Sequence, residues 1–176
     1  MDPVKQEVGA SQGRALKREE ASAAVHKRQR VAHSSTVVLT PLSGVGGDYP
    51  AAYLLEIDGA SILLDVGADL AEMQDPAPLQ QLRAIAPRVD AVLISQGGLR
   101  WMGGLPYAVA HLGLDAPVYA TLPTVKMGTM ASYDAYCALR RQVGRVPYTL
   151  NEVDAAFDRI VQLKYSQTVR LSGRAA

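Results

Sequence analysis

The dipeptide Asp58-Gly59 separates two apolar runs, and this feature restricts the possible folds more than any other in the chain. The first run is Ala52–Ile57 and the second is Ser61–Asp65. An Asp-Gly pair in this position is typical of a two-residue type I′ hairpin, because both residues readily adopt positive φ. Another β-type run, Thr36–Thr40, precedes a glycine-rich connection at 44–48. The pattern predicts three sequential antiparallel strands.

After Asp65 the pattern changes to helices that alternate with strands. Apolar residues recur at helical spacing around 79–86, and a strand-like run follows at Asp90–Ser95. The same reasoning predicts helices at 105–112 and 122–141, a helix capped by Asn151 that runs to about Leu163, and strands at 117–121 and 168–171. Hairpin strands followed by alternating helices indicate an α/β layer architecture.

Residues 1–35 differ from the rest in composition. They hold seven Lys or Arg against four Asp or Glu and show no apolar periodicity, so we expect a disordered basic tail ahead of a folded region at 36–176. The tail has no apolar core of a secretory signal. Its two basic clusters resemble a bipartite nuclear-import signal and consist of Lys17, Arg18, Lys27, Arg28 and Arg30.

The folded region carries eleven Lys or Arg against thirteen Asp or Glu, a balance that argues against a nucleic-acid-binding face built on bulk charge. The uncharged run Trp101–Leu114 is too short and too interrupted to span a bilayer, so we expect a soluble protein. Cys137 is the single cysteine, which excludes an intrachain disulfide, and it is interpreted as a packed, unreactive thiol.

Three sequence patterns suggest a functional site, but the residues in each support that interpretation poorly. Ser95 follows a buried strand, but Leu93 stands where a nucleophile elbow needs glycine, and the candidate base His111 is interpreted as a packing residue of an apolar helix. The glycines at 44–48 lack the Lys-Ser/Thr ending of a phosphate loop. Tyr133 and Tyr136 could stack on bases near Lys126, although tyrosines one helical turn apart more often cover the edge of a core.

Asp65 is a better candidate for a functional position. It ends a buried strand, where a carboxylate is costly unless it pairs, caps a turn or binds a metal. We expect it to accept hydrogen bonds from loop amides, with Arg100 nearby as a partner charge.

The loop that follows Ala91–Ile94 resembles the metal-binding loop of the metallo-β-lactamase family, which reads His-x-His-x-Asp-His and holds one or two zinc ions. Ser95 and the later Gly-x-Leu-Pro-Tyr match that loop. The four ligand positions of the motif, however, are occupied by Gln96, Gly98, Arg100 and Trp101. None of these is a good zinc ligand, and the cation at 100 repels a divalent metal. The resemblance therefore implies a hydrolase scaffold without a metal, a cofactor or catalytic residues, in which Asp65 is the ancestral carboxylate of the site.

Longer strings resemble one inactive branch of the metallo-β-lactamase/β-CASP nucleases, the subunit 2 family of the cleavage and polyadenylation specificity factor. These strings include Thr40–Val45, Leu63–Gly67, Asp90–Ser95, Gly104–Val109, Val153–Asp158 and Gln162–Gln167. The resemblance covers about 37–173. It implies the N-terminal portion of a metallo-β-lactamase-like αββα sandwich, so we expect residues 36–176 to form a partial domain in which one sheet lacks its partner and leaves apolar surface uncovered.

The same resemblance implies a nuclear, non-catalytic scaffold subunit of the mRNA cleavage and polyadenylation complex. Such a subunit pairs with the related active endonuclease and with scaffold subunits, and contacts pre-mRNA as part of the complex. Two alternatives remain open: a metal-dependent hydrolase or RNA nuclease of the metallo-β-lactamase family, which needs ligands that the loop does not offer, and the analogous inactive subunit of the Integrator complex.

Overall fold

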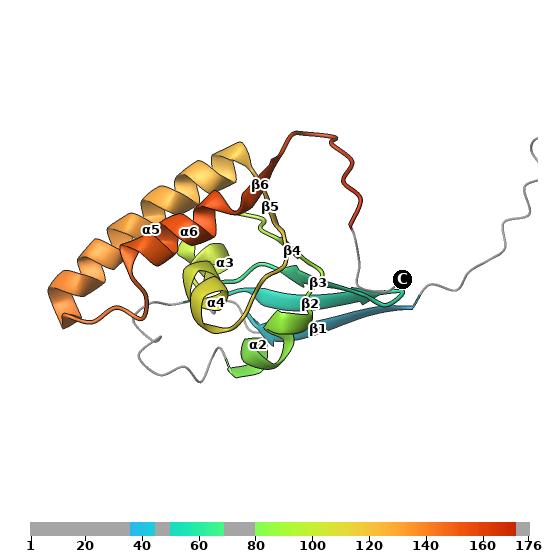
Figure 1. Cartoon of the computed structure of the whole chain (residues 1–176), viewed down its shortest axis with the longest axis horizontal. Coiled ribbons are helices and arrows are strands. Elements are labelled where there is room, and N and C mark those ends of the chain that lie inside the picture. The colour runs from blue at the N-terminus through green and yellow to red at the C-terminus, as the bar shows by residue number, and fades with distance from the viewer. Residues whose placement is uncertain (1–35, 45–49, 69–79, 172–176) are drawn as a thin grey trace, which may run out of the picture. The chain divides into compact units, whose positions relative to one another are not determined.

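The computed structural model describes residues 36–44, 50–68 and 80–171. These residues form a six-stranded mixed sheet with helices packed against it (Figure 1). The strands lie in the sheet in the order in which they occur in the chain. The predicted α/β architecture is therefore confirmed.

The first three strands are antiparallel, as predicted. They are β1 (Val37–Ser43), β2 (Ala52–Ile57) and β3 (Ala60–Leu64). Asp58 and Gly59 form the turn between β2 and β3 with φ values of 50° and 87°. Positive φ at both central residues is the signature of a type I′ turn, whose twist matches that of the strands on either side. The Asp-Gly pair thus fixes the register in which Leu55 faces Ile62.

The second half of the sheet is parallel. Strands β4 (Ala91–Leu93), β5 (Val118–Thr121) and β6 (Ile160–Leu163) follow one another beyond β3. Helical segments connect them, because parallel neighbours need long crossover connections. The connecting segments are α2 (Gln80–Ile85), the 3₁₀ turn η3 (Ala86–Arg88), α3 (Leu99–Met102), α4 (Leu105–His111), α5 (Leu122–Val143) and α6 (Leu150–Asp158).

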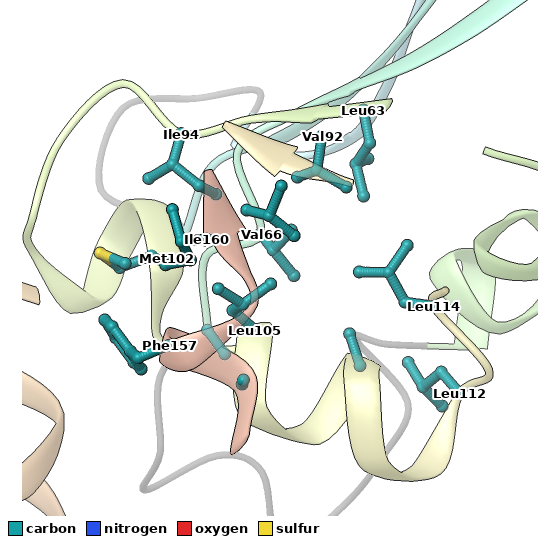
Figure 2. Close-up of a cluster of buried hydrophobic side chains, with 14 of the residues drawn as sticks. Leu63, Val66, Val92, Ile94, Met102, Leu105, Leu112, Leu114, Phe157 and Ile160 are labelled. Carbon is teal, nitrogen blue, oxygen red and sulfur yellow. The ribbon is translucent and has the colours of Figure 1, made fainter. Parts of the chain in front are cut away.

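The hydrophobic core lies between the helices and one face of the sheet (Figure 2). Alternation along the strands directs Leu63, Val92 and Val118 toward the helices, and all three are at most 1% exposed. Met102 from α3 and Leu105 from α4 fill the space opposite them and are fully buried. Every helix thus contributes apolar side chains to this single core. The exposed parts of α5 do not take part in it.

Helix α6 begins earlier than predicted. The N-cap is Thr149, whose hydroxyl accepts a hydrogen bond from the Glu152 amide, while the Glu152 carboxylate accepts one from the Thr149 amide. This reciprocal pair is a capping box and satisfies two amides that the first turn leaves without partners. The prediction of Asn151 as the cap was wrong, because the Thr-x-x-Glu spacing at 149–152 outweighs a single Asn.

Two predictions for the C-terminal region were also wrong. Helix α6 ends at Asp158, and Ile160–Leu163 forms β6 instead of the end of that helix. These residues pair with β5 in the register Val118↔Ile160 to Thr121↔Leu163. The strand is favoured over the helix that the periodicity predicted, because pairing completes backbone hydrogen bonds along the sheet edge. The strand predicted at 168–171 does not form: Lys164 and Gln167 close a turn with Ser166 at φ 57°, which directs the chain away from the sheet.

Candidate functional site

The candidate site lies at the carboxyl ends of β3 and β4, where the loops 65–68 and 94–104 begin. In parallel sheets this edge is the usual place for ligand sites, because loops from neighbouring strands meet there. Backbone hydrogen bonds join the two loops directly: the Val66 amide donates to Trp101 O at 2.7 Å, and the Gly104 amide donates to Val66 O at 2.9 Å. The loops therefore form one rigid unit.

Gly67 lies in closest contact with the opposite loop. A Cβ atom at this position would lie 1.9 Å from the carbonyl oxygen of Arg100 and 2.7 Å from the amide nitrogen of Ala51. These two groups are themselves hydrogen bonded, with the Ala51 amide donating to Arg100 O at 2.7 Å. The loops can approach this closely only because residue 67 has no side chain.

Asp65 accepts two hydrogen bonds from Ser95 across the site. The Ser95 amide donates to Oδ1 at 2.7 Å and the Ser95 hydroxyl donates to Oδ2 at 2.8 Å. Asp65 has a φ of 61°, a left-handed conformation that Asp tolerates better than most residues. The expected hydrogen bond from a loop amide is confirmed.

The prediction that Arg100 is the charged partner of Asp65 was wrong. Burial raises the pKa of the Asp65 carboxyl, and the two hydrogen bonds from Ser95 offset part of that rise. Arg100 is not among the groups that shift this pKa; it is exposed, and its guanidinium lies over the Trp101 ring at 5.9 Å from the ring centre. Stacking on an adjacent indole holds the cation at the surface.

The raised pKa of Asp65 predicts a specific pH dependence. Because the folded state binds the Asp65 proton more tightly than the unfolded state, this carboxyl stabilises the fold most below its unfolded pKa, about 3.9, and that contribution is lost as pH rises through the folded pKa. The free energy of unfolding of wild type, relative to Asp65→Asn, should therefore fall in urea titrations as pH rises above the unfolded pKa of about 3.9.

Asp115→Asn is the matched control, since it removes an exposed carboxylate that pairs with Arg159 at the surface. A wild-type advantage over Asp65→Asn that grows with pH would show that the hydrogen bonds from Ser95 outweigh burial, contrary to this expectation.

The four ligand positions carry no metal-binding set. Gln96 and Arg100 are exposed, while Gly98 and Trp101 are half-buried, and a Cβ at Gly98 would lie 2.9 Å from the Trp101 ring. Across residues 36–44, 50–68 and 80–171, no cluster of three or more His, Cys, Asp or Glu side chains has the geometry to hold a metal ion.

Helix α5 packs against the same loop, a contact that the sequence did not reveal. A Cβ at Gly97 would lie 2.7 Å from Thr124 O and 2.9 Å from the Gly128 amide nitrogen. Gly128 of the same helix admits the sulfur of Met102, which belongs to the same loop. The paired glycines at 97 and 128 are the only signal of this contact in the sequence, and glycine alone does not say which element approaches.

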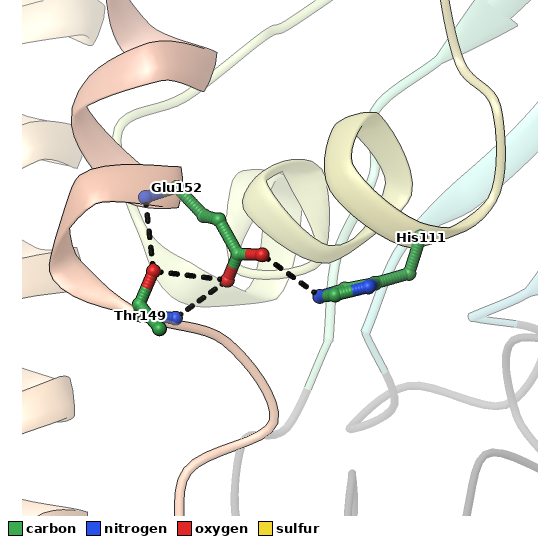
Figure 3. Close-up of polar contacts among 3 residues, drawn as sticks. All are labelled: His111, Thr149 and Glu152. Atoms are coloured by element: carbon green, nitrogen blue, oxygen red, sulfur yellow. Dashed lines mark hydrogen bonds and ion pairs between the residues drawn. The ribbon is translucent and has the colours of Figure 1, made fainter.

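His111 lies at the end of α4, where it is partly exposed and its ring contacts that of Tyr107 with centroids 4.8 Å apart, so its interpretation as a packing residue holds only in part. Its Nε2 atom lies 3.2 Å from Glu152 Oε1, which joins α4 to the capping box of α6 (Figure 3). The hydrogen bond from the Thr149 amide is the largest of several causes that lower the pKa of Glu152. Ser95 and His111 thus have separate carboxylate partners, and no Ser-His pair forms here.

The remaining candidates lie on α5. The Tyr133 hydroxyl donates to Asp154 of α6, and Tyr136 packs against the core, as predicted for tyrosines that cover its edge. Cys137 is exposed, so the prediction of a packed thiol was wrong. The import candidates Lys17, Arg18, Lys27, Arg28 and Arg30 lie outside the described residues. No helix in the described part of the chain is long and apolar enough to cross a membrane.

The chain is similar to known proteins over most of its length. It is 47% identical over 141 residues to cleavage and polyadenylation specificity factor subunit 2 of Oryza sativa subsp. japonica, and 40% identical over 141 residues to the protein of that name in Arabidopsis thaliana. The match to the probable subunit 2 of Caenorhabditis elegans is 43% over 140 residues. Each match covers 80% of this chain, which spans only 16% to 19% of the relatives' own length.

These relatives agree with the resemblance expected from the sequence strings. A model of the metallo-beta-lactamase superfamily domain matches residues 54–176, which include most of β2, strands β3 to β6 and all the described helices. With this match and the fold in agreement, the chain belongs to the metallo-β-lactamase superfamily.

Proposed function

We propose that this chain is a non-catalytic scaffold component of the mRNA 3′-end processing machinery. The observation that carries the proposal is the 47% identity to a cleavage and polyadenylation specificity factor subunit 2 over 80% of the chain. Similar proteins from yeasts are named cleavage factor two protein 2. The names of these relatives place them in one process, and similarity of this extent supports the same process for this chain.

The geometry of the site supports the non-catalytic part of the proposal. Activation of water by zinc needs several imidazole or carboxylate ligands around an open coordination position. Here the Asp65 carboxylate is engaged by Ser95, while a cation and an indole occupy two of the four ligand positions. The close contact at Gly67 leaves no space for even a methyl group at that point between the two loops. A rigid, closed edge of this kind suits a structural role.

The partner in this proposal is the related active endonuclease subunit, which the chain would bind and help to place on pre-mRNA. Titration of the purified chain with that endonuclease, followed by calorimetry, tests the pairing. A one-to-one complex is expected. Absence of measurable heat with tens of micromolar endonuclease, for a chain shown to be folded by circular dichroism, would contradict the proposed pairing.

The first prediction from this proposal concerns metal content. The purified chain should contain far less than one zinc per molecule after dialysis against buffer with a small excess of zinc, measured by elemental analysis. The four-site variant Gln96→His, Gly98→His, Arg100→Asp and Trp101→His serves as the positive control, because it places three imidazoles and one carboxylate in the motif. About one zinc per wild-type chain would contradict the proposal and favour a metal-dependent hydrolase.

The second prediction concerns the basic tail, for which we propose a role in nuclear import. A fusion of residues 1–35 to a cytoplasmic reporter should accumulate in the nucleus, and Lys27→Ala, Arg28→Ala and Arg30→Ala together should reduce the nuclear-to-cytoplasmic ratio several-fold. The matched control, Glu19→Gln with Glu20→Gln, alters the charge of the tail but leaves both basic clusters intact. A wild-type fusion that stays cytoplasmic would exclude this role.

A further inference from the structure

Three arginines gather where helix α5 ends and the chain turns back toward α6. Arg140 and Arg141 lie in the last turn of α5, and Arg145 follows Gly144, whose φ of 72° ends the helix. All three are exposed. Of the eleven Lys and Arg residues of 36–176, three thus fall within six consecutive residues. We call Arg140, Arg141 and Arg145 the arginine tip.

The arginine tip lies at the far end of a helix pair. Helix α5 begins directly after β5, and α6 leads into β6 through one residue, so the opposite ends of both helices point away from those strands (Figure 1). With 22 residues, α5 is about 33 Å long. The tip is therefore accessible to a partner in solution.

The positive charge of the tip is not neutralised within the described part of the chain. Residues 135–151 contain no Asp or Glu, and none of the three arginines forms an ion pair with another described residue. The next carboxylate along the chain, that of Glu152, is engaged by its own capping box and by His111. Arg141 donates from Nε to the Cys137 carbonyl, and the two terminal nitrogens of its guanidinium have no hydrogen-bond partner among the described residues.

Stabilisation of the helix end explains only part of this cluster. The last turn of a helix carries a partial charge of about −0.5, which a single cation complements. The three arginines supply several times that charge, and Arg145 lies beyond the last turn. By contrast, Arg159 at the end of α6 is neutralised by Asp115. The excess positive charge of the tip indicates a surface that binds anions.

The chemistry around the tip identifies the kind of anion. Guanidinium groups bind phosphate groups through pairs of parallel hydrogen bonds. A protein partner would need apolar anchors beside the charges, and between residues 139 and 150 only Val143 is a large apolar side chain with high exposure. Membrane surfaces are bound by clusters of roughly four to eight cations, more than the tip offers. These observations favour a nucleic acid.

The tip has no means of reading bases. Tyr148 carries the only aromatic ring between residues 139 and 150, and at 3% exposure it cannot stack on a base. A surface of this kind contacts phosphates alone. We propose that the arginine tip binds the phosphate backbone of an RNA strand without sequence preference, an inference that rests on the proposed function because that function supplies RNA as the nucleic acid.

Fluorescence anisotropy with a labelled oligouridylate of about 20 nucleotides, longer than a typical single-strand site, tests this proposal on the whole chain. The triple variant Arg140→Gln, Arg141→Gln and Arg145→Gln should raise the dissociation constant about tenfold or more at about 50 mM salt. The plot of the logarithm of the binding constant against that of the salt concentration should also become less steep by about 2, because each contact to a single-strand phosphate contributes roughly 0.7.

The triple variant Arg83→Gln, Lys164→Gln and Arg170→Gln is the matched control, since it removes the same charge from exposed residues outside the tip. It should bind the RNA nearly as wild type does. Both variants keep residues 1–35, so binding by that basic segment is common to them. Circular dichroism establishes that both are folded.

Equal binding by the tip variant and the control would overturn the proposal, because net charge or residues 1–35 would then account for the affinity. A polyglutamate of equal length that binds wild type more tightly than the RNA does, and loses that affinity in the tip variant, would also overturn it and assign the tip to an acidic protein. The endonuclease titration is a separate readout. A chain that forms the one-to-one complex but shows no RNA binding through the tip contradicts this inference alone, whereas RNA binding through the tip without the complex contradicts the proposed pairing alone.

Discussion

Gly67→Ala is expected to prevent folding or to lower the free energy of unfolding by about 3 kcal/mol or more. The added methyl group would lie 1.9 Å from Arg100 O, a backbone atom that already accepts a hydrogen bond from the Ala51 amide. Relief of the clash requires separation of the two loops and loss of the hydrogen bonds from Val66 and Gly67. Urea unfolding followed by circular dichroism measures the loss.

Gly144→Ala provides the control for this prediction. Gly144 ends α5 with φ 72°, and nothing lies within 4 Å of the position that an added methyl group would occupy, so alanine there adds backbone strain without a clash. The expected cost is about 1 kcal/mol. Equal losses in the two variants would show that the loops move apart at little cost, contrary to the rigid unit described for the site.

Leu63→Ala is expected to cost about 2 to 5 kcal/mol, because it removes a fully buried side chain from the centre of the sheet and leaves a cavity. Figure 2 shows Leu63 next to Val92, and strand pairing fixes the backbone of both residues. The measurement is again urea unfolding, with the slope compared to that of wild type.

Leu39→Ala is the matched control for Leu63→Ala. It removes the same atoms from a neighbouring part of the sheet, but Leu39 is 56% exposed. The expected cost is less than about 1 kcal/mol. Similar losses for Leu39 and Leu63 would show that Leu39 is covered in solution, contrary to its exposure in the structure.

Local signals were sufficient to predict much of the fold. Asp58-Gly59 predicted the hairpin because a type I′ turn depends on the φ preferences of its own two residues. Helix α5 was predicted nearly in full, at 122–141 against the observed Leu122–Val143; the prediction did not use Gly144, which ends the helix in a left-handed conformation. Residues 160–163 were predicted incorrectly, since their conformation is set by pairing with β5, about forty residues earlier in the chain.

The sequence predicted which residues occupy the candidate site, but it predicted their contacts only in part. The sequence showed which residues occupy the four ligand positions, and it placed a costly buried carboxylate at Asp65. It did not identify Ser95 as the donor of both hydrogen bonds, or Glu152 as the partner of His111. Such contacts join residues from separate loops and helices, so they exist only after the sheet has brought those elements together.

The order of the strands has a consequence for synthesis. Each strand from β2 to β6 pairs with the one before it, and among the described strands no later one inserts between earlier ones. During translation the sheet can therefore grow at a single edge as the ribosome releases each strand, and nothing already paired has to open for the next addition. The β2–β3 hairpin closes over two residues, whereas β6 can join only after α5 and α6 have been synthesised, so we expect the antiparallel half to form first and the parallel half more slowly.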